Sequence, residues 1–376
     1  MIYFDNAATT IIDPLVKKKL VVSLDDLVGN PSSKHGLGLK TKSIIKKSRK
    51  IVADYLNVDE EEIIFTSSAT ESNNIAIFNT YELYKNMHII TTKIEHSSLL
   101  LPIEKLKENG VQVSYIKLNI DGKIDIENLK SLIQDNTRLV AISMVNNEIG
   151  TIQDVETIGA ILKNINPDIL FLVDGVQAIG HLKIDIRNSK IDYFSFSGHK
   201  IYAPKGIGVL YKNKEIILKR TIFGGNQENG LRSGTENVLG IFCIGEAINK
   251  LKNENYEKFF KEIKQYLIKK LKMAFDDIII NSSENCASHI ISITFSNIPS
   301  SYIVASLSIK DIYISSSSAC NEKQNNYSYV IEHLFSKEAA YNTIRISFGF
   351  YNTFEECDLF VSALKDVIHN YTLLHD

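Results

Sequence analysis

Between about residue 60 and residue 215, short apolar runs alternate with stretches in which apolar residues recur at helical spacing, such as Leu99, Ile103 and Leu106. Each short run has the length and composition of a buried β-strand, and the stretches between them are typical of amphipathic helices. The predicted strands are Glu62–Phe65, His88–Thr91, Val111–Ile116, Leu139–Val145, Leu170–Asp174, Tyr193–Ser197 and Gly208–Tyr211. This alternation predicts an α/β fold with a largely parallel sheet, whose ligands bind beyond the carboxyl ends of the strands.

The segments on either side of this region have a different character. Before it, residues 41–56 carry their apolar side chains on one helical face and their lysines elsewhere, which predicts a solvated helix rather than a basic binding surface. After it, a Lys/Glu-rich helix is predicted over about residues 245–275, and the Ser315–Ser318 run is typical of a loop. Further strands are predicted near Ile278–Ile280, Ile290–Phe295 and Thr343–Ser347.

Two domains are expected, because 376 residues exceed the size at which a single hydrophobic core keeps growing. The pattern predicts a large α/β domain over residues 12–250. Residues 1–11 and 251–376 are expected to form a smaller α+β domain.

Composition and charge exclude several classes of partner. The formal net charge is −2 and the isoelectric point is near 6.5, so neither nucleic acid nor an anionic membrane surface is indicated. No apolar run approaches the roughly 18–20 residues needed to span a bilayer. The first residues, Met1–Asp5, contain neither a basic start nor an apolar signal core, so a cytoplasmic location is predicted.

The cysteines argue against a metal site and a disulfide scaffold. Cys243, Cys286, Cys320 and Cys357 are far apart and form no CxxC pair, so no metal is predicted and each is judged as a single thiol. Cys243 lies among apolar residues and is expected in the core, whereas Cys286 and Cys357 have polar neighbours.

Two predicted strands end at or just before residues suited to a cofactor site, Asp174 and Lys200. Lys200 follows a Ser-x-Ser-Gly-His turn, which has the hydroxyls, imidazole and backbone N–H groups of a phosphate cradle. Asp174 ends the strand before it, and an acid beside the pyridinium nitrogen together with a lysine for a covalent bond is what pyridoxal phosphate needs. A surface lysine and a buried structural aspartate are the alternatives.

Two further segments are weaker signals. Residues 65–71 run from a strand into a hydroxyl-rich turn and a helix, which ordinary helix capping also explains. His96 follows the strand His88–Thr91 and could stack on a cofactor ring and transfer protons, although an isolated histidine is more often structural.

In their order along the chain these segments resemble those of the cysteine desulfurases of the NifS/IscS type, fold-type I pyridoxal-phosphate enzymes of the class V aminotransferase family. The segments that carry the resemblance are residues 3–10, 29–33, 69–71, 95–96, 146–151, 174–177, 195–200, 204–208, 232–237, 315–320 and 344–349. The resemblance covers nearly the whole chain. It implies a large domain with a mainly parallel seven-stranded sheet and a smaller α+β domain that carries the catalytic cysteine.

The resemblance also assigns roles by position. It implies that Lys200 bonds the cofactor, Asp174 pairs with the ring nitrogen, and His96 stacks on the ring. The residues implied to contact the cofactor's hydroxyl side or its phosphate are Gln177, Asn147, Ala69, Thr70, Ser197 and His199. Thr235 is implied to reach the phosphate of a neighbouring subunit, so a homodimer with shared sites is expected. Arg345, with Asn147, is implied to bind the substrate carboxylate.

Cys320 is the candidate nucleophile. It follows the Ser-rich run and precedes polar residues, a setting that offers the exposure a reactive thiol needs; a lone thiol in a loop is the alternative. The resemblance implies conversion of L-cysteine to L-alanine, with the sulfur held as a persulfide on Cys320. The stretch between Cys320 and Arg345 is long, and in this length it resembles the same stretch of one subgroup of the family. The resemblance implies that, as in that subgroup, sulfur is delivered directly to an acceptor, such as an iron–sulfur scaffold or a tRNA-thiolation enzyme. Cys320 is then also a candidate ligand of a transferred iron–sulfur cluster.

Three residues depart from the family pattern, and other functions remain open. Ser68 and Ser317 stand where glycine is usual, and Gly175 stands where alanine is usual. A selenocysteine lyase or an aminotransferase would share the cofactor residues and differ in its products. A catalytically silent assembly subunit would be expected to lack Lys200, Asp174 or Cys320, and all three are present.

Overall fold

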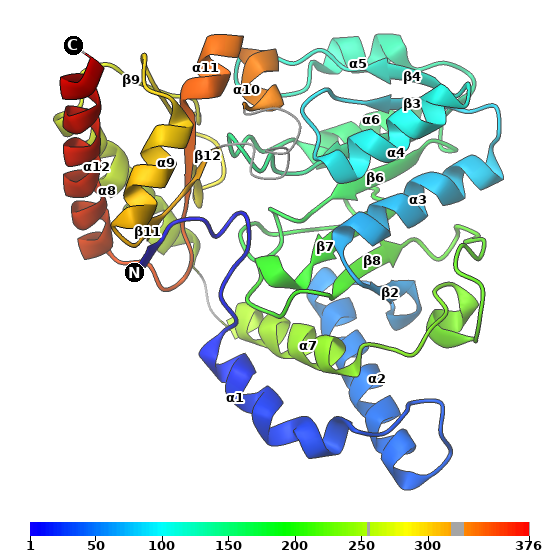
Figure 1. Cartoon of the computed structure of the whole chain (residues 1–376). Coiled ribbons are helices and arrows are strands. Elements are labelled where there is room, and N and C mark those ends of the chain that lie inside the picture. The colour runs from blue at the N-terminus through cyan, green and yellow to red at the C-terminus, as the bar shows by residue number, and fades with distance from the viewer. Residues whose placement is uncertain (254–255, 317–326, 376) are drawn as a thin grey trace.

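The structure is a computed structural model that describes residues 1–253, 256–316 and 327–375 (Figure 1). Cys320 and Ser317 lie outside the described residues. The strands of the larger sheet are β2 (Ile63–Thr66), β3 (His88–Thr91), β4 (Gln112–Tyr115), β5 (Thr137–Ser143), β6 (Leu170–Asp174), β7 (Tyr193–Ser197) and β8 (Gly208–Lys212). The helices around it are α1 (Pro14–Ser23), α2 (Gly36–Leu56), α3 (Ala69–Leu83), α4 (Ser97–Glu108), α5 (Ile126–Leu132), α6 (Val155–Ile165) and α7 (Val238–Asn253), with short 3₁₀ turns η1 (Leu24–Leu27), η2 (Glu60–Glu62), η3 (Gly198–Lys200) and η4 (Gln227–Gly230).

The seven-stranded sheet has the order β2-β8-β7-β6-β5-β3-β4. The strands from β7 to β4 are parallel, and β8 runs antiparallel to both of its neighbours. The predicted α/β class with a mainly parallel seven-stranded sheet is therefore confirmed. Because the parallel strands share one direction, their carboxyl ends meet at one edge of the sheet.

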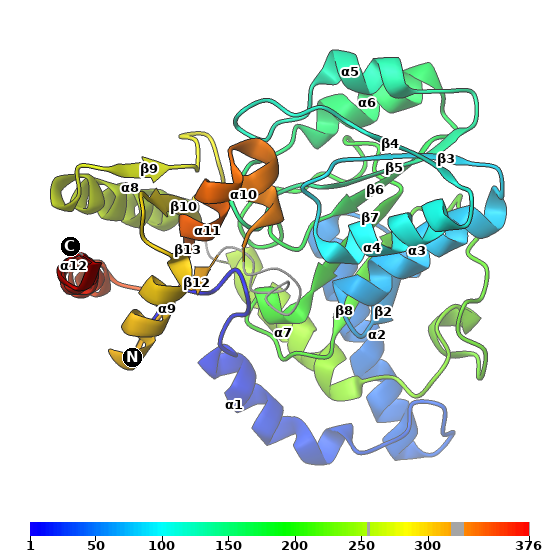
Figure 2. The same cartoon turned by 45° about the horizontal axis from the view of Figure 1, so that its top comes forward.

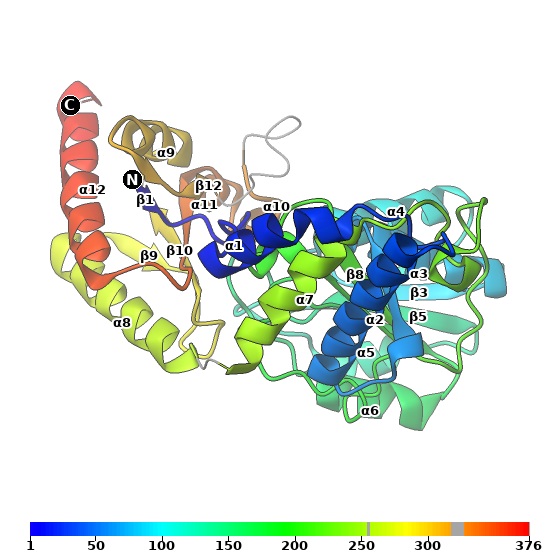
Figure 3. The ribbon, with the colours of Figure 1, turned by 90° about the horizontal axis from the view of Figure 1, so that it is seen from below.

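Helices cover both faces of this sheet, and alternate residues of β5 show how. Leu139 and Ala141 pack into the core beneath α3 and α4, whereas Val140 and Ile142 pack into the core beneath α2, α5, α6 and α7. This period of two in a strand buried on both sides explains why the strands read as continuous apolar runs. Figures 1 and 3 show α2 and α7 side by side on one face of the sheet.

Polar side chains cap several helices at their first or last residue. Asp13 caps α1 by accepting hydrogen bonds from the backbone N–H groups of Leu15 and Val16, and Asp154 caps α6 in the same way. At the other end of α2, Asn57 adopts the left-handed conformation (φ 54°) that stops a helix. These local signals set where α1 and α6 begin and where α2 ends.

A second, smaller layer lies beside the sheet (Figures 1 and 2). A four-stranded sheet has the order β12-β13-β10-β9, and β1 pairs with β11. The elements of this layer are β1 (Ile2–Tyr3), α8 (Glu257–Ala274), β9 (Ile278–Ile280), β10 (Ile290–Phe295), α9 (Ser300–Ile309), β11 (Ile312–Tyr313), β12 (Ser315–Ser316), α10 (Tyr329–Leu334), α11 (Lys337–Asn342), β13 (Thr343–Ser347) and α12 (Phe354–His375). Phe4 anchors the start of the chain here, since its ring lies 5.5 Å from that of Phe348 and 5.7 Å from that of Phe360.

Two predictions made from the sequence were wrong in this part of the chain. The helix expected over residues 245–275 is two helices, because α7 packs on α2 while α8 packs on α12 in the other layer. Ser315–Ser316, expected in a loop, pairs with β13 as the short strand β12. Pairing partners that lie far along the chain decided both outcomes.

The hydrophobic cores follow the two layers. One core joins Phe4 with residues of α8, β10, α9, β13 and α12, and two others lie on the two faces of the large sheet. A fourth, smaller cluster joins Ile94 and Ile149 to α10 and α11. We propose that residues 12–250 form one domain, and that residues 1–11 and 251–376 form the other. Among the described residues, we find no helix with the length and apolar character needed to cross a membrane.

Gly175 allows the ring of Phe194 to fill the space beside β6. A Cβ atom at residue 175 would lie 1.9 Å from Cζ of Phe194, whose side chain is fully buried in β7. Neither group has room to move in a close-packed interior. The glycine that departs from the family pattern is thus matched to the phenylalanine on the neighbouring strand.

We therefore expect Gly175→Ala to lower the free energy of unfolding by about 1–3 kcal/mol through overpacking, as measured by urea denaturation. Adding Phe194→Leu should recover part of that loss, so the double variant should be more stable than the sum of the two single losses predicts. Gly36→Ala is the matched control, because a Cβ atom there meets nothing within 4 Å. An unchanged midpoint for Gly175→Ala would contradict this account.

Candidate active site

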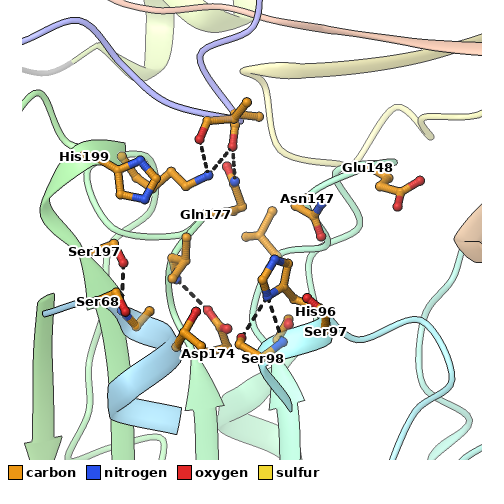
Figure 4. A pocket seen from close by; sticks show the side chains of 18 of the residues that line it. Ser68, His96, Ser97, Ser98, Asn147, Glu148, Asp174, Gln177, Ser197 and His199 are labelled. Atoms are coloured by element: carbon orange, nitrogen blue, oxygen red, sulfur yellow. Dashed lines mark hydrogen bonds between the residues drawn. The ribbon is translucent and has the colours of Figure 1, made fainter. Parts of the chain in front are cut away.

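A cavity of about 250 Å³ opens where the carboxyl edge of the large sheet meets the small layer. The cavity-lining residues that the sequence singled out are Ala69, Thr70, His96, Asn147, Asp174, Gln177, Ser197, His199, Lys200 and Arg345 (Figure 4). Thr235 does not line this cavity; it is exposed, in the loop before α7. Segments that are far apart in the sequence thus meet around one space.

Lys200 stands at the end of the short turn η3 that follows β7. Its ammonium donates hydrogen bonds to the backbone carbonyls of Ala7 and Ala8, at 2.5 and 2.8 Å. The same Ala7 carbonyl accepts a hydrogen bond from Nε2 of Gln177 at 2.9 Å. The N-terminal segment therefore holds both the Lys200 amine and the Gln177 amide at the cavity wall (Figure 4).

Asp174 is the last residue of β6 and is 4% exposed. Its Oδ1 accepts from the backbone N–H of Val176 at 3.0 Å, and its Oδ2 accepts from Nδ2 of Asn73 at 2.9 Å. Asn73 is oriented in turn by Ser195, whose hydroxyl donates to its Oδ1 at 2.6 Å. These bonds stabilise an ionised carboxylate in a buried position.

The sequence reasoning missed Asn73, although a signal for it exists. Asn73 is fully buried on α3 and faces the sheet, where the pattern of that helix calls for an apolar residue. A polar residue on a buried helical face needs a partner and often marks a site.

His96 caps the N-terminus of α4. Its Nδ1 accepts the backbone N–H of Ser98 at 3.1 Å and lies 2.8 Å from the Ser98 hydroxyl. Burial lowers the pKa of this imidazole, with Asp174 opposing the shift and Lys200 adding to it. A neutral ring whose Nδ1 is an acceptor carries its proton on Nε2.

The N-terminus of α3 forms a cradle suited to a phosphate group. The backbone N–H of Ala69 donates to the hydroxyl of Ser197 at 2.8 Å, and Thr70 lies in the first turn of this 15-residue helix. His199 lies beside it with its Nδ1 3.2 Å from the Thr9 hydroxyl, and burial, Lys200 and Lys205 lower its pKa to about 4. Free donors and the positive end of the helix dipole favour an anion here.

A glycine in the neighbouring strand makes this cradle sterically accessible. A Cβ atom on Gly208 would lie 2.5 Å from the backbone carbon of Ser68, so only glycine lets β8 pass so close to the turn. Ser68 replaces the usual glycine without strain, because it is extended and its hydroxyl caps α3 by accepting from the N–H of Glu71.

Arg345 projects from β13 and is 3% exposed. One terminal nitrogen donates to the Asn147 carbonyl at 2.9 Å, and the other pairs with Asp5 at 2.9 Å. Its Nε is buried and has no hydrogen-bond partner among the described residues. An unsatisfied donor on a guanidinium beside a cavity fits a carboxylate ligand.

Two buried carboxyl groups near the cavity were not assigned roles from the sequence. Burial raises the pKa of Glu95 to about 7, against hydrogen bonds from Ser143 and Thr92. Burial likewise raises the pKa of Glu148 to about 7, and the hydroxyl of Ser328, the cap of α10, donates to its carboxylate. Both groups therefore titrate near neutral pH.

The described cysteines are all buried. Cys286 and Cys357 have polar neighbours in the sequence, but these neighbours did not indicate exposure of the thiols. Cys286 is 8% exposed, and Cys357 is fully buried in the core of the small layer. Burial and neighbouring carboxylates raise the pKa of Cys243 to about 11 and that of Cys357 to about 12. Neither of these two thiols is set up as a nucleophile.

Comparison with known proteins agrees with this geometry. A sequence model of the family described as aminotransferase class-V matches residues 2–360. Cysteine desulfurase IscS of Proteus mirabilis (strain HI4320) is 36% identical over 98% of this chain and 92% of its own length. A solved structure described as a NifS-like protein superposes with a TM-score of 0.92 at 35% identity, covering 98% of this chain and 99% of that one.

A second solved structure, described as SspA in complex with cysteine, superposes with a TM-score of 0.81 at 34% identity and covers 94% of this chain and all of that one. Similarity of this extent, together with a family model that spans almost the entire chain, goes beyond a shared fold. The chain belongs to the class V aminotransferase family and, within it, to the cysteine desulfurases of the NifS/IscS type.

Proposed function

We infer that this protein is a pyridoxal-phosphate-dependent cysteine desulfurase, which converts L-cysteine to L-alanine and keeps the sulfur for transfer. The observation that carries this function is the meeting of Lys200, Asp174 and His96 in one cavity whose wall includes a helix N-terminus. That set provides an amine, a buried acid, a neutral imidazole and an anion site, which is what this cofactor requires.

The residues present fit the cofactor. When bound, pyridoxal phosphate supplies a ring that accepts the electron pair left at Cα of the substrate. Lys200 would bond it, Asp174 would hold a proton on the ring nitrogen, and His96 would stack on the ring. The cradle of Ala69, Thr70, Ser197 and His199 would bind the phosphate, and Asn147 and Gln177 would contact the hydroxyl side.

Substrate binding is assigned to the guanidinium of Arg345. Its unpartnered Nε and its place on the cavity wall suit the carboxylate of L-cysteine, with Asn147 beside it. Lys200 takes the proton from Cα, since its amine already lies at the cavity wall. His96, with its proton on Nε2, is placed to donate or accept a proton above the same centre.

Cys320 is the proposed sulfur acceptor. Its thiolate forms a bond to the substrate sulfur as the bond from that sulfur to Cβ breaks, and the electron pair stays with the three-carbon fragment. One proton then replaces the sulfur at Cβ, the proton that Lys200 removed returns to Cα, and the fragment leaves as alanine. The buried positions of Cys243 and Cys357 and their raised pKa values support the choice of Cys320.

The proposed acceptor is a protein, either an iron–sulfur scaffold or a tRNA-thiolation enzyme. An iron–sulfur cluster in transfer would then have Cys320 as one ligand. Incubation of ³⁵S-loaded protein with each acceptor distinguishes the two, and loss of label to neither would exclude both. The cytoplasmic location predicted from the sequence stays a prediction, which fractionation of the source cells tests.

A selenocysteine lyase or an aminotransferase on the same scaffold is the alternative. An aminotransferase would release a keto acid instead of alanine, and a lyase specific for selenium would leave L-cysteine unchanged. The 36% identity to an IscS cysteine desulfurase over nearly the whole chain favours desulfuration.

Lys200→Ala should abolish alanine formation and remove the visible absorption band of covalently held cofactor, because no other amine lines the cavity in the part of the chain that the structure describes. Absorption spectroscopy and an alanine assay measure both effects. Lys205→Ala is the control, since Lys205 lies outside the cavity wall. Turnover by the Lys200 variant at even a tenth of the original rate would remove this residue from its role.

Cys320→Ser should keep the cofactor band and lose sulfide and persulfide formation by at least 100-fold. The hydroxyl is a far weaker nucleophile toward sulfur than a thiolate. Sulfide is measured with L-cysteine and a reductant, and Cys243→Ala serves as the control that removes a buried thiol. If the Cys320 variant released sulfide at the original rate, another group would have to be the sulfur acceptor.

We propose a homodimer in which Thr235 of each subunit reaches the phosphate cradle of the other. Thr235 is exposed and outside its own cavity, and the surface near α1 exposes Val21, Val22 and Val28, which are 61, 77 and 69% exposed. Light scattering should give twice the chain mass of 42.4 kDa, and Thr235→Ala should weaken cofactor binding. A monomeric mass at micromolar concentration would contradict the shared site.

A further inference from the structure

A stacked pair of histidines lies behind the cavity and has no part in the chemistry above. His289, 1% exposed, directly precedes β10, and His181 follows the turn after β6. Their ring centroids are 3.5 Å apart and their planes differ by 9°. Neither ring lines the cavity, so any influence on the reaction must pass through another side chain.

That side chain is Gln177. Nε2 of His289 lies 3.3 Å from Oε1 of Gln177, and Nε2 of Gln177 donates to the Ala7 carbonyl at 2.9 Å. If the Gln177 amide were rotated by 180°, its Oε1 would face the carbonyl oxygen of Ala7, and two acceptors would be in contact. The amide orientation therefore requires that His289 donate a hydrogen bond and Gln177 accept it.

The surroundings of His289 favour that donor form. Burial, then His181, Lys264, Arg345 and Lys200, hold the pKa of His289 well below its usual range, so the ring is neutral. With the proton on Nε2, Nδ1 carries only a lone pair, and it has no partner among the described residues.

We propose that His289 is a positioning residue that holds the Gln177 amide with its NH₂ group turned to Ala7 and to the cavity. One amide hydrogen binds the Ala7 carbonyl, which also accepts from Lys200, and the other is left for the phenolic oxygen of the cofactor. A donor at that oxygen stabilises its anionic form and so affects the colour and the affinity of the bound cofactor. This inference rests on the proposed function.

The experiment is a double-mutant cycle between His289 and Gln177, read on the purified enzyme with added pyridoxal phosphate. His289→Phe keeps a ring against His181 and removes the donor. We expect a shifted visible absorption maximum and a cofactor dissociation constant about tenfold higher, the size of one hydrogen bond to a charged group. In the Gln177→Ala background the same change should have no further effect.

Three variants make the result specific. His289→Gln restores an N–H donor and should return the absorption maximum toward that of the original enzyme. His181→Phe keeps the stack without touching Gln177 and should leave the spectrum unchanged. His289→Leu, which also lacks a donor, replaces His289→Phe in the cycle if the larger ring prevents folding.

Each outcome decides the matter. Shifts that are equal with and without the Gln177 side chain, or no shift in His289→Phe, would overturn the positioning role. Failure of the unsubstituted enzyme to bind pyridoxal phosphate would instead overturn the proposed function, so the two failures are distinguishable.

Discussion

The hydrogen bonds that the N-terminal segment makes to both layers are the constraint on which the site depends. Residues 5–10 pair with Arg345 through Asp5, accept from Lys200 at Ala7 and Ala8, and accept from Gln177 at Ala7. The Thr9 hydroxyl lies beside the imidazole of His199, and the Thr10 hydroxyl donates to the backbone carbonyl of that residue. Since β1 is paired in the small layer and η3 follows the large sheet, this segment fixes how the two walls of the cavity face each other.

Burial of charge shapes the chemistry of the cavity. Hydrogen-bond donors surround the buried Asp174 carboxylate, whereas burial lowers the pKa of His96 and raises the pKa values of Glu95 and Glu148 to about 7. Lys200 and Arg345 are the cations of the cavity wall. These two cations suit a phosphate and a substrate carboxylate, the anionic ligands that the proposed function requires.

Departures from the family pattern are compensated by contacts in the structure. Gly175 makes room for the Phe194 ring, and Ser68 caps α3 where glycine is usual. The His181–His289 pair fills the space behind Gln177 with a neutral donor rather than a charge.

The sequence alone determined the positions of β3, β6 and β7 to the residue, because each is a short run buried on both faces. It also identified the strand-end residues that the cavity brings together, since local spacing puts them after strands that share a direction. It could not identify Asn73, the Ala7 carbonyl or His289, whose partners lie 101, 170 and 112 residues away. It also merged α7 and α8 into one helix, because helical spacing does not reveal which layer each half packs against. Only the tertiary structure decides such contacts, since the direction of a buried side chain follows from packing between distant segments and leaves no period in the sequence.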